Sequence, residues 1–119
     1  MMGRCGRVAL WNGGQNCSAN MRQLVPASRK DEFLAKVLAK VEALKVGDGL
    51  AEGVSLGPLI EPAAMKKVEE HVKDALSKGG KVLTGGKPHA LGGQFYEPTI
   101  VTGATSDMLV AKDETFGPF

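Results

Sequence analysis

An amphipathic helix that begins at Pro62 and ends at a pair of glycines is the feature that most constrains the fold. Proline suits the first turn of a helix, where its missing N–H would have no partner, and Gly79-Gly80 stops the periodic run. Apolar residues recur on one face between them, namely Met65, Val68, Val72, Ala75 and Leu76. The segment therefore predicts a packed helix whose opposite face is charged and exposed to solvent.

A second helix is predicted over residues 29–45. Its apolar residues recur at spacings of one, three and four: Phe33, Leu34, Val37, Leu38, Val41 and Leu44. Ser28, followed three residues later by Asp31, resembles a capping arrangement at the start of this helix. The glycines after Lys45 break the period, so residues 45–60 are predicted to form a long irregular connection, of the kind that often lies over a partner or a ligand.

Short β-favouring runs bounded by glycines predict strands at Val82–Thr84 and Tyr96–Thr102, and a weaker signal predicts one at Met21–Val25. The resulting order is strand, helix, helix, strand, strand. This order predicts an α/β domain with a largely parallel sheet and two main amphipathic helices.

The composition excludes several classes of protein. The 119 residues are 43% hydrophobic and 24% charged, which suits one globular domain with a modest core. The net charge is +2 with both signs interspersed, which argues against nucleic-acid binding. No apolar run suits a membrane span or a secretory signal, so we expect a cytoplasmic protein with reduced thiols. Cys5 and Cys17 have no cysteine or histidine neighbours at ligand spacing, so neither a disulfide framework nor a metal site is predicted.

The chemistry of the chain is concentrated in Asn12-Gly13-Gly14-Gln15-Asn16-Cys17, where glycines allow close approach of the backbone to a substrate. A thiol attacks carbon as its thiolate, and an ordinary cysteine is only a few per cent ionised at neutral pH. A free cysteine is more often a small buried hydrophobe, and this alternative for Cys17 stays open on the local sequence.

His71 and His89 are the two side chains whose ordinary pKa lies near neutrality. His71 falls beside Val68 and Val72 and is predicted to border the buried stripe. His89 follows a proline between glycine-rich turns and is predicted to be solvated. Structural roles are the expectation for both.

Several short motifs resemble those of aldehyde dehydrogenases. Gly14-Gln15-Asn16-Cys17 resembles the G-Q-x-C nucleophile motif, and Glu114-Thr115-Phe116-Gly117-Pro118 resembles the E-x-F-G-P motif. Three further landmarks occur between them in the family's order: Leu44–Asp48, Gly57–Ile60 and Tyr96–Ile100. The five in order, covering nearly the whole chain from Trp11, favour Cys17 as the equivalent of the nucleophile.

The resemblance implies a covalent mechanism in which Cys17 attacks an aldehyde, and a thiohemiacetal is oxidised by NAD or NADP to a thioester that water hydrolyses. It also implies that the Cys17 backbone N–H stabilises the oxyanion, that Glu114 holds the nicotinamide ribose and that Phe116 packs near the nicotinamide. An ordinary core position is the alternative for Phe116.

Other parts of the family pattern have no counterpart in residues 1–119, which resemble a fragment of the nucleophile-bearing catalytic domain. The E-L-G-G general base, the upstream oxyanion asparagine, the cofactor domain and the oligomerisation segment are unmatched. We therefore expect the isolated chain to bind no cofactor and to be inactive. The choice between NAD and NADP belongs to the unmatched cofactor domain.

The later part of the chain most resembles succinate-semialdehyde dehydrogenases, but Trp11 stands where they carry the arginine that binds the substrate carboxylate. A tryptophan there resembles aminoaldehyde and betaine-aldehyde dehydrogenases, in which aromatic walls attract an ammonium group. Packing in the core is the alternative for Trp11.

Two functions remain for the chain. The first is a piece of an oxidoreductase, which predicts exposed apolar surface. The second is a non-catalytic remnant that self-associates into a homo-oligomer or serves as a protein-interaction module through its helix stripes.

Overall fold

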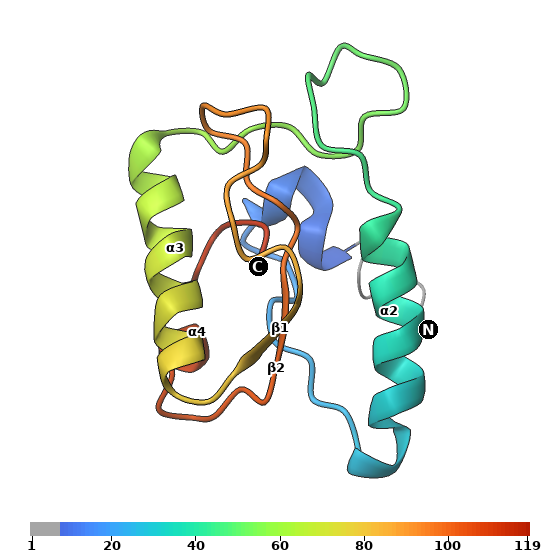
Figure 1. The fold of residues 1–119 in the computed structure, drawn as a ribbon, viewed down its shortest axis with the longest axis vertical. Coiled ribbons are helices and arrows are strands. Elements are labelled where there is room, and N and C mark those ends of the chain that lie inside the picture. The colour runs from blue at the N-terminus through green and yellow to red at the C-terminus, as the bar shows by residue number, and fades with distance from the viewer. Residues whose placement is uncertain (1–7) are drawn as a thin grey trace.

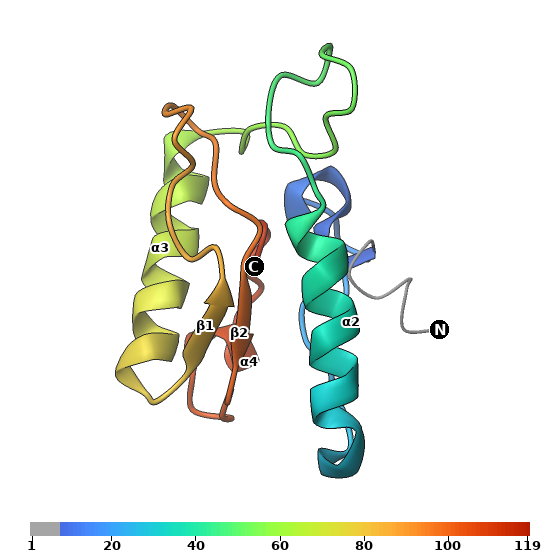
Figure 2. The same cartoon turned by 45° about the vertical axis from the view of Figure 1, so that its right-hand side comes forward.

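The computed structural model describes residues 8–119. Short 3-10 turns at Trp11–Gly14 and Ala27–Arg29 precede the first long helix. The remaining elements are α2 (Lys30–Glu42), α3 (Pro62–Ser77), β1 (Lys81–Thr84), β2 (Ile100–Thr102) and α4 (Leu109–Lys112). The two strands lie between α2 and α3, so the chain forms helix, sheet and helix layers (Figure 1 and Figure 2).

Helix α2 confirms the helix predicted at 29–45, although it is shorter at both ends. The cap predicted at Ser28 is wrong, because Ser28 lies inside the 3-10 turn Ala27–Arg29 and no side chain caps the helix. Asp31 and Glu32 do lie in the first turn of α2, where negative charge suits the positive end of the helix.

Helix α3 confirms the prediction of a helix that begins at Pro62, which occupies its first turn. The helix ends at Ser77, and Gly79 follows with a φ of 91°, a left-handed conformation that glycine adopts without a Cβ penalty. The buried face differs by one position from the expected stripe. Leu76 is 49% exposed, whereas His71 is buried at 3%.

Strands β1 and β2 pair antiparallel, so the prediction of a largely parallel sheet is wrong for residues 8–119. Parallel pairing needs a crossover, usually a helix, whereas a loop over residues 85–99 joins these two strands. The strand predicted at Met21–Val25 is also wrong, because this segment is irregular. The run predicted at Tyr96–Thr102 contains a strand only from Ile100 onward.

Three clusters of buried side chains form the core. The first contains Leu10, Val37, Val41 and Leu56, and it packs α2 against the start of the described chain and the loop that follows α2. The second contains Leu59, Val68, Val72 and Tyr96, and the third contains Ala75, Met108 and Val110. Helix α3 contributes to the last two clusters, so it joins the strands and α4 into one body.

The irregular connection predicted from residue 45 to residue 60 is confirmed. It projects beyond the helices at the top of Figure 1. Near its base the Gly47 N–H donates a hydrogen bond of 2.9 Å to the carbonyl of Leu56.

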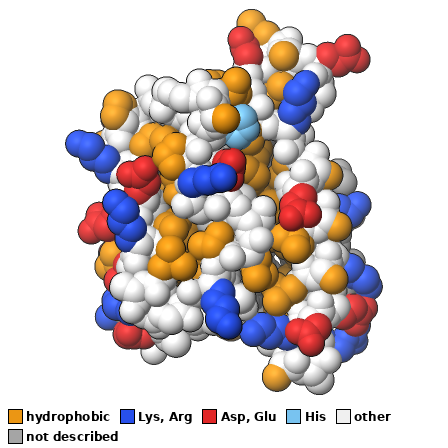
Figure 3. Space-filling model, viewed as in Figure 1, with side chains coloured by type: hydrophobic (Ala, Val, Ile, Leu, Met, Phe, Trp, Pro, Cys, Tyr) orange, Lys and Arg blue, Asp and Glu red, His pale blue; other side chains and the backbone are white. Residues whose placement is uncertain are grey.

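Apolar side chains also lie on the surface, as expected for a fragment. Leu24 and Leu50 are 99% and 97% exposed, and Ile60 and Trp11 are largely exposed as well. Figure 3 shows apolar side chains gathered over the middle of one face. Within residues 8–119, no helix has the length and apolar character needed to cross a membrane.

Candidate active site

Cys17 lies exposed on a tight turn that follows the first 3-10 turn. The Ala19 N–H donates to the carbonyl of Asn16 at 3.0 Å, which closes a turn with Cys17 at a central position. The Asn16 side-chain oxygen accepts hydrogen bonds of 3.1 Å from both the N–H and the hydroxyl of Ser18. The alternative of a buried, hydrophobe-like cysteine is therefore wrong for this chain, and the thiol is open to a reactant.

The backbone just before Cys17 runs through three successive left-handed residues. Asn12, Gly13 and Gly14 have φ values of 54°, 64° and 71°. Glycine is needed at Gly14 for a second reason, because a Cβ there would overlap the carbonyl of Gly117. The two motifs singled out in the sequence, at opposite ends of the chain, thus pack backbone against backbone.

Gln15 ties the cysteine-bearing segment to the loop before α3. Its side-chain oxygen accepts a hydrogen bond of 2.9 Å from the Ile60 N–H, and its amide nitrogen donates to the carbonyl of Pro58 at 3.4 Å. Sequence reasoning recognised Gln15 only as a motif letter. The structure shows that it joins the first motif to the Gly57–Ile60 landmark.

Arg22 joins the segment after Cys17 to the residues before Glu114. Its Nε donates to the carbonyl of Val110 at 2.6 Å and an Nη donates to the carbonyl of Asp113 at 3.0 Å. Val110 lies in the single turn of α4 and Asp113 follows it, so neither carbonyl has a partner further along the helix. Sequence reasoning missed Arg22. The one available signal was that a single arginine follows shortly after the cysteine.

The segment Glu114–Pro118 is exposed at its start and buried at its end. The Glu114 side chain is exposed, Thr115 is buried, and Phe116 is half-buried with a left-handed φ of 55°. Pro118 accepts a hydrogen bond of 2.8 Å at its carbonyl from the Thr99 N–H. The half-burial of Phe116 leaves both the role near the nicotinamide and the ordinary core position as predictions.

His71 connects α3 to this segment. Its Nδ1 lies 2.8 Å from the hydroxyl of Thr115, and both side chains are buried. Burial is the main cause that lowers the pKa of His71 below its ordinary value of 6.5, and Lys67 lowers it further. The carboxylates of Asp113 and Glu70 oppose this shift. The neutral ring can accept a hydrogen bond from the Thr115 hydroxyl at Nδ1.

The free energy of unfolding is expected to fall as the pH drops below about 6.5, because unfolded His71 binds a proton there that the folded ring resists. The pKa of His71 is lower in the folded state than in the unfolded state. The contribution of His71 to the free energy of unfolding is therefore fully present above pH 6.5, and it is lost as the pH falls toward the pKa of the folded state. Denaturation of the chain between about pH 7.5 and 5 measures it. His71→Gln should remove this dependence and His89→Gln should keep it; equal slopes for wild type and His71→Gln contradict the prediction.

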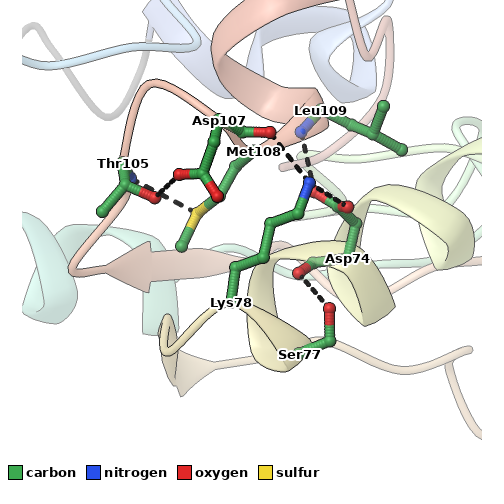
Figure 4. A network of polar contacts seen from close by, with 7 residues as sticks. All are labelled: Asp74, Ser77, Lys78, Thr105, Asp107, Met108 and Leu109. Atoms are coloured by element: carbon green, nitrogen blue, oxygen red, sulfur yellow. Dashed lines mark hydrogen bonds and ion pairs between the residues drawn. The ribbon is translucent and has the colours of Figure 1, made fainter.

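A polar network fastens α3 to the start of α4 (Figure 4). The Asp74 carboxylate accepts a hydrogen bond of 2.7 Å from the Leu109 N–H and pairs with Lys78 at 2.7 Å. The Lys78 ammonium also donates to the carbonyl of Asp107 at 2.8 Å. Hydrogen bonding to Lys78 is the largest cause that holds the pKa of Asp74 below its ordinary value. Helix α3 therefore supports the chain that leads into Glu114.

The other sequence candidates lie apart from these contacts. Trp11 is 70% exposed, so the core-packed alternative is wrong for this chain. His89 is half-buried rather than fully solvated, and its Nδ1 accepts a hydrogen bond of 3.1 Å from the Leu91 N–H. Among residues 8–119, no hydrogen bond or ion pair joins Cys17, Glu114 and Trp11 to one another, and no cluster of acidic, histidine and cysteine side chains could hold a metal ion.

Comparisons with known proteins cover nearly all of this chain. The family model described as the aldehyde dehydrogenase family matches residues 2–119. A glutarate-semialdehyde dehydrogenase of Pseudomonas aeruginosa is 53% identical over 107 residues, and a succinate semialdehyde dehydrogenase of Acinetobacter baylyi is 47% identical over 107 residues. In each case the match spans 90% of this chain and 22% of the relative.

The fold matches solved structures equally well. A succinate-semialdehyde dehydrogenase from Burkholderia pseudomallei superposes with a TM-score of 0.95 at 50% identity, over 98% of this chain and 24% of that one. A betaine aldehyde dehydrogenase from Staphylococcus aureus superposes with a TM-score of 0.91 at 30% identity, over the same shares. The chain thus spans about a quarter of the length of these relatives. It belongs to the aldehyde dehydrogenase family.

Proposed function

We propose that this chain supplies the nucleophile of an NAD(P)-dependent aldehyde dehydrogenase and that Cys17 is that nucleophile. The observation that carries the proposal is the contact between Gly14 and Gly117, since it brings the exposed cysteine turn against the Glu114–Pro118 segment. A nucleophile and a cofactor-binding segment must lie side by side if a hydride is to pass from the bound substrate to the cofactor.

In this proposal the Cys17 thiolate adds to the carbonyl carbon of an aldehyde, which forms a carbon–sulfur bond and an alkoxide. The Cys17 N–H, which donates no hydrogen bond within residues 8–119, stabilises that alkoxide. Loss of a hydride from the same carbon gives a thioester. Water then breaks the carbon–sulfur bond and releases the carboxylic acid and the thiol.

Glu114 and Phe116 fit the role of holding the nicotinamide half of the cofactor. The Glu114 carboxylate is exposed and can accept hydrogen bonds from the two ribose hydroxyls. Phe116 offers a half-buried aromatic ring on a backbone fixed at both sides by Thr115 and Gly117. When bound, the oxidised dinucleotide supplies a hydride acceptor.

The 119-residue chain alone is expected to give no turnover, because the family's general base and cofactor domain have no match in it. The assay combines the chain with propanal and NAD and follows reduced nicotinamide. The matched test is a restored enzyme, in which residues 2–119 replace the stretch of the Pseudomonas aeruginosa relative that corresponds to the same part of the family model. Turnover by the restored enzyme supports the proposal; Cys17-dependent turnover by the chain alone contradicts the expectation.

The exposed indole of Trp11 supports an aldehyde with a cationic tail as substrate. Cation–π attraction of about 0.5–2 kcal/mol corresponds to a preference of roughly 2- to 30-fold. In the restored enzyme, Trp11→Arg should therefore shift the ratio of kcat/KM values away from aminobutanal and toward succinate semialdehyde. The relatives named glutarate-semialdehyde and succinate semialdehyde dehydrogenase support the opposite expectation, a substrate with a carboxylate tail. A clear preference of the unsubstituted restored enzyme for succinate semialdehyde rejects the Trp11 argument.

A second candidate function is self-association without catalysis. The observation that favours it is the apolar surface, with Leu24 and Leu50 almost fully exposed. Exposed apolar side chains drive association when they form a contiguous patch. Light scattering gives the mass of the chain in solution, and the fluorescence of an apolar dye reports its exposed apolar surface. A strict monomer that binds no dye argues against this candidate.

A further inference from the structure

Helix α3 contacts the Glu114–Pro118 segment on two adjacent turns. Gly117 lies so close to the Val68 side chain that a Cβ on Gly117 would overlap it. One turn later, the His71 ring reaches Thr115 with a separation of 2.8 Å between Nδ1 and the hydroxyl oxygen. Val68 makes an apolar contact that any aliphatic residue of its size could make, whereas His71 makes a directional one.

The directional contact falls between the two residues assigned to the cofactor. Thr115 is buried, whereas its neighbours Glu114 and Phe116 are exposed and half-buried. The Thr115 hydroxyl therefore anchors the segment from inside while the side chains on either side of it face outward. The left-handed φ of 55° at Phe116 is an uncommon conformation for a bulky residue, and surrounding contacts must hold it in place.

We propose that His71 is a positioning residue, whose hydrogen bond to Thr115 sets the orientation of Glu114 and Phe116. This inference rests on the proposed function for the identity of what Glu114 and Phe116 bind. The anchoring itself is a property of the 119-residue chain and can be measured without cofactor or turnover. A failure of the anchoring therefore shows in the chain, and a failure of the proposed function shows in the restored enzyme.

The competing explanation is that His71 only fills space in the core. Four variants separate the two. His71→Leu and Thr115→Val keep approximate volume and remove the hydrogen bond. His71→Asn and Thr115→Ser keep polar atoms near the positions of Nδ1 and the hydroxyl. If His71 positions the segment, the two apolar variants lose the protection of the segment from amide hydrogen exchange, and the two polar variants retain it.

Amide hydrogen exchange, measured by NMR on the full chain, supplies the readout. The Thr99 N–H donates to the carbonyl of Pro118, so its protection reports whether the segment stays in place. The Gly47 N–H, which donates to Leu56 in another cluster, is the control.

We expect Thr115→Val and His71→Leu to raise the exchange rate of Thr99 by about tenfold or more relative to that of Gly47. Thr115→Ser and His71→Asn should stay within about threefold of wild type. The proposal is overturned if both apolar variants leave Thr99 protected, if they raise the exchange of Gly47 equally, or if the polar variants lose as much protection as the apolar ones.

Discussion

Gly14→Ala is expected to lower the free energy of unfolding by about 3 kcal/mol or more. Two effects add at this position. The φ of 71° is left-handed, which costs a residue with a Cβ about 1 kcal/mol. The Cβ would also overlap the carbonyl of Gly117, which belongs to backbone and cannot rotate away as a flexible side chain would. Chemical denaturation of the chain measures the loss.

Gly92→Ala is the matched control. Gly92 has nearly the same φ, 75°, but nothing lies within 4 Å of the Cβ that alanine would add. Its substitution should therefore cost only the conformational part, about 1 kcal/mol. Equal losses for the two variants would mean that the backbones of Gly14 and Gly117 do not meet, and the two motifs would no longer be neighbours.

Cys17→Ser is expected to lower kcat of the restored enzyme by at least about 10³-fold, because a serine hydroxyl is far less ionised than a thiol and the nucleophile acts as part of a unit. KM for the cofactor should change little, since Glu114 and Phe116 are untouched. Steady-state kinetics with saturating aldehyde and dinucleotide measures both.

Cys5→Ser is the control for Cys17→Ser. Cys5 lies outside the described residues and belongs to none of the five motifs. The restored enzyme with Cys5→Ser should keep its turnover within about twofold. Retained turnover in Cys17→Ser, or loss of turnover only in Cys5→Ser, contradicts the assignment of the nucleophile.

Local signals in the sequence were enough to predict both long helices. The helix from Pro62 has a proline in its first turn, a period of apolar residues and a glycine stop, and these signals act within a few residues of one another. The start of the first helix was less well predicted, because Ser28 lies in a 3-10 turn that the capping pattern does not distinguish from a helix start.

Strand pairing depends on residues far apart, and the sequence predicted it poorly. The parallel sheet was inferred from the order of elements, which included a strand at Met21–Val25 that does not form. The segment is instead drawn along the end of α4 by Arg22, which contacts carbonyls about ninety residues away. A single arginine in a short polar and apolar run gives no indication of a partner at that separation.

The motifs indicated candidate residues for the chemistry but not the contacts that support them. Cys17 and Glu114 could be named as candidates because they lie in short recognisable patterns. His71 was expected to have a structural role, but its hydrogen bond to Thr115 could not be predicted. The period of a helix indicates which face is buried, and it does not indicate which polar atom that face contacts. The contact between Gly14 and Gly117 is likewise invisible to composition and spacing.

The most direct test of the central claim is mass spectrometry of the restored enzyme quenched in acid during turnover. The account predicts an added acyl mass on the peptide that contains Cys17, which appears only when both aldehyde and oxidised dinucleotide are present and disappears as the substrate is consumed. Turnover with no acyl group on that peptide, or with the acyl group on another cysteine, would contradict it.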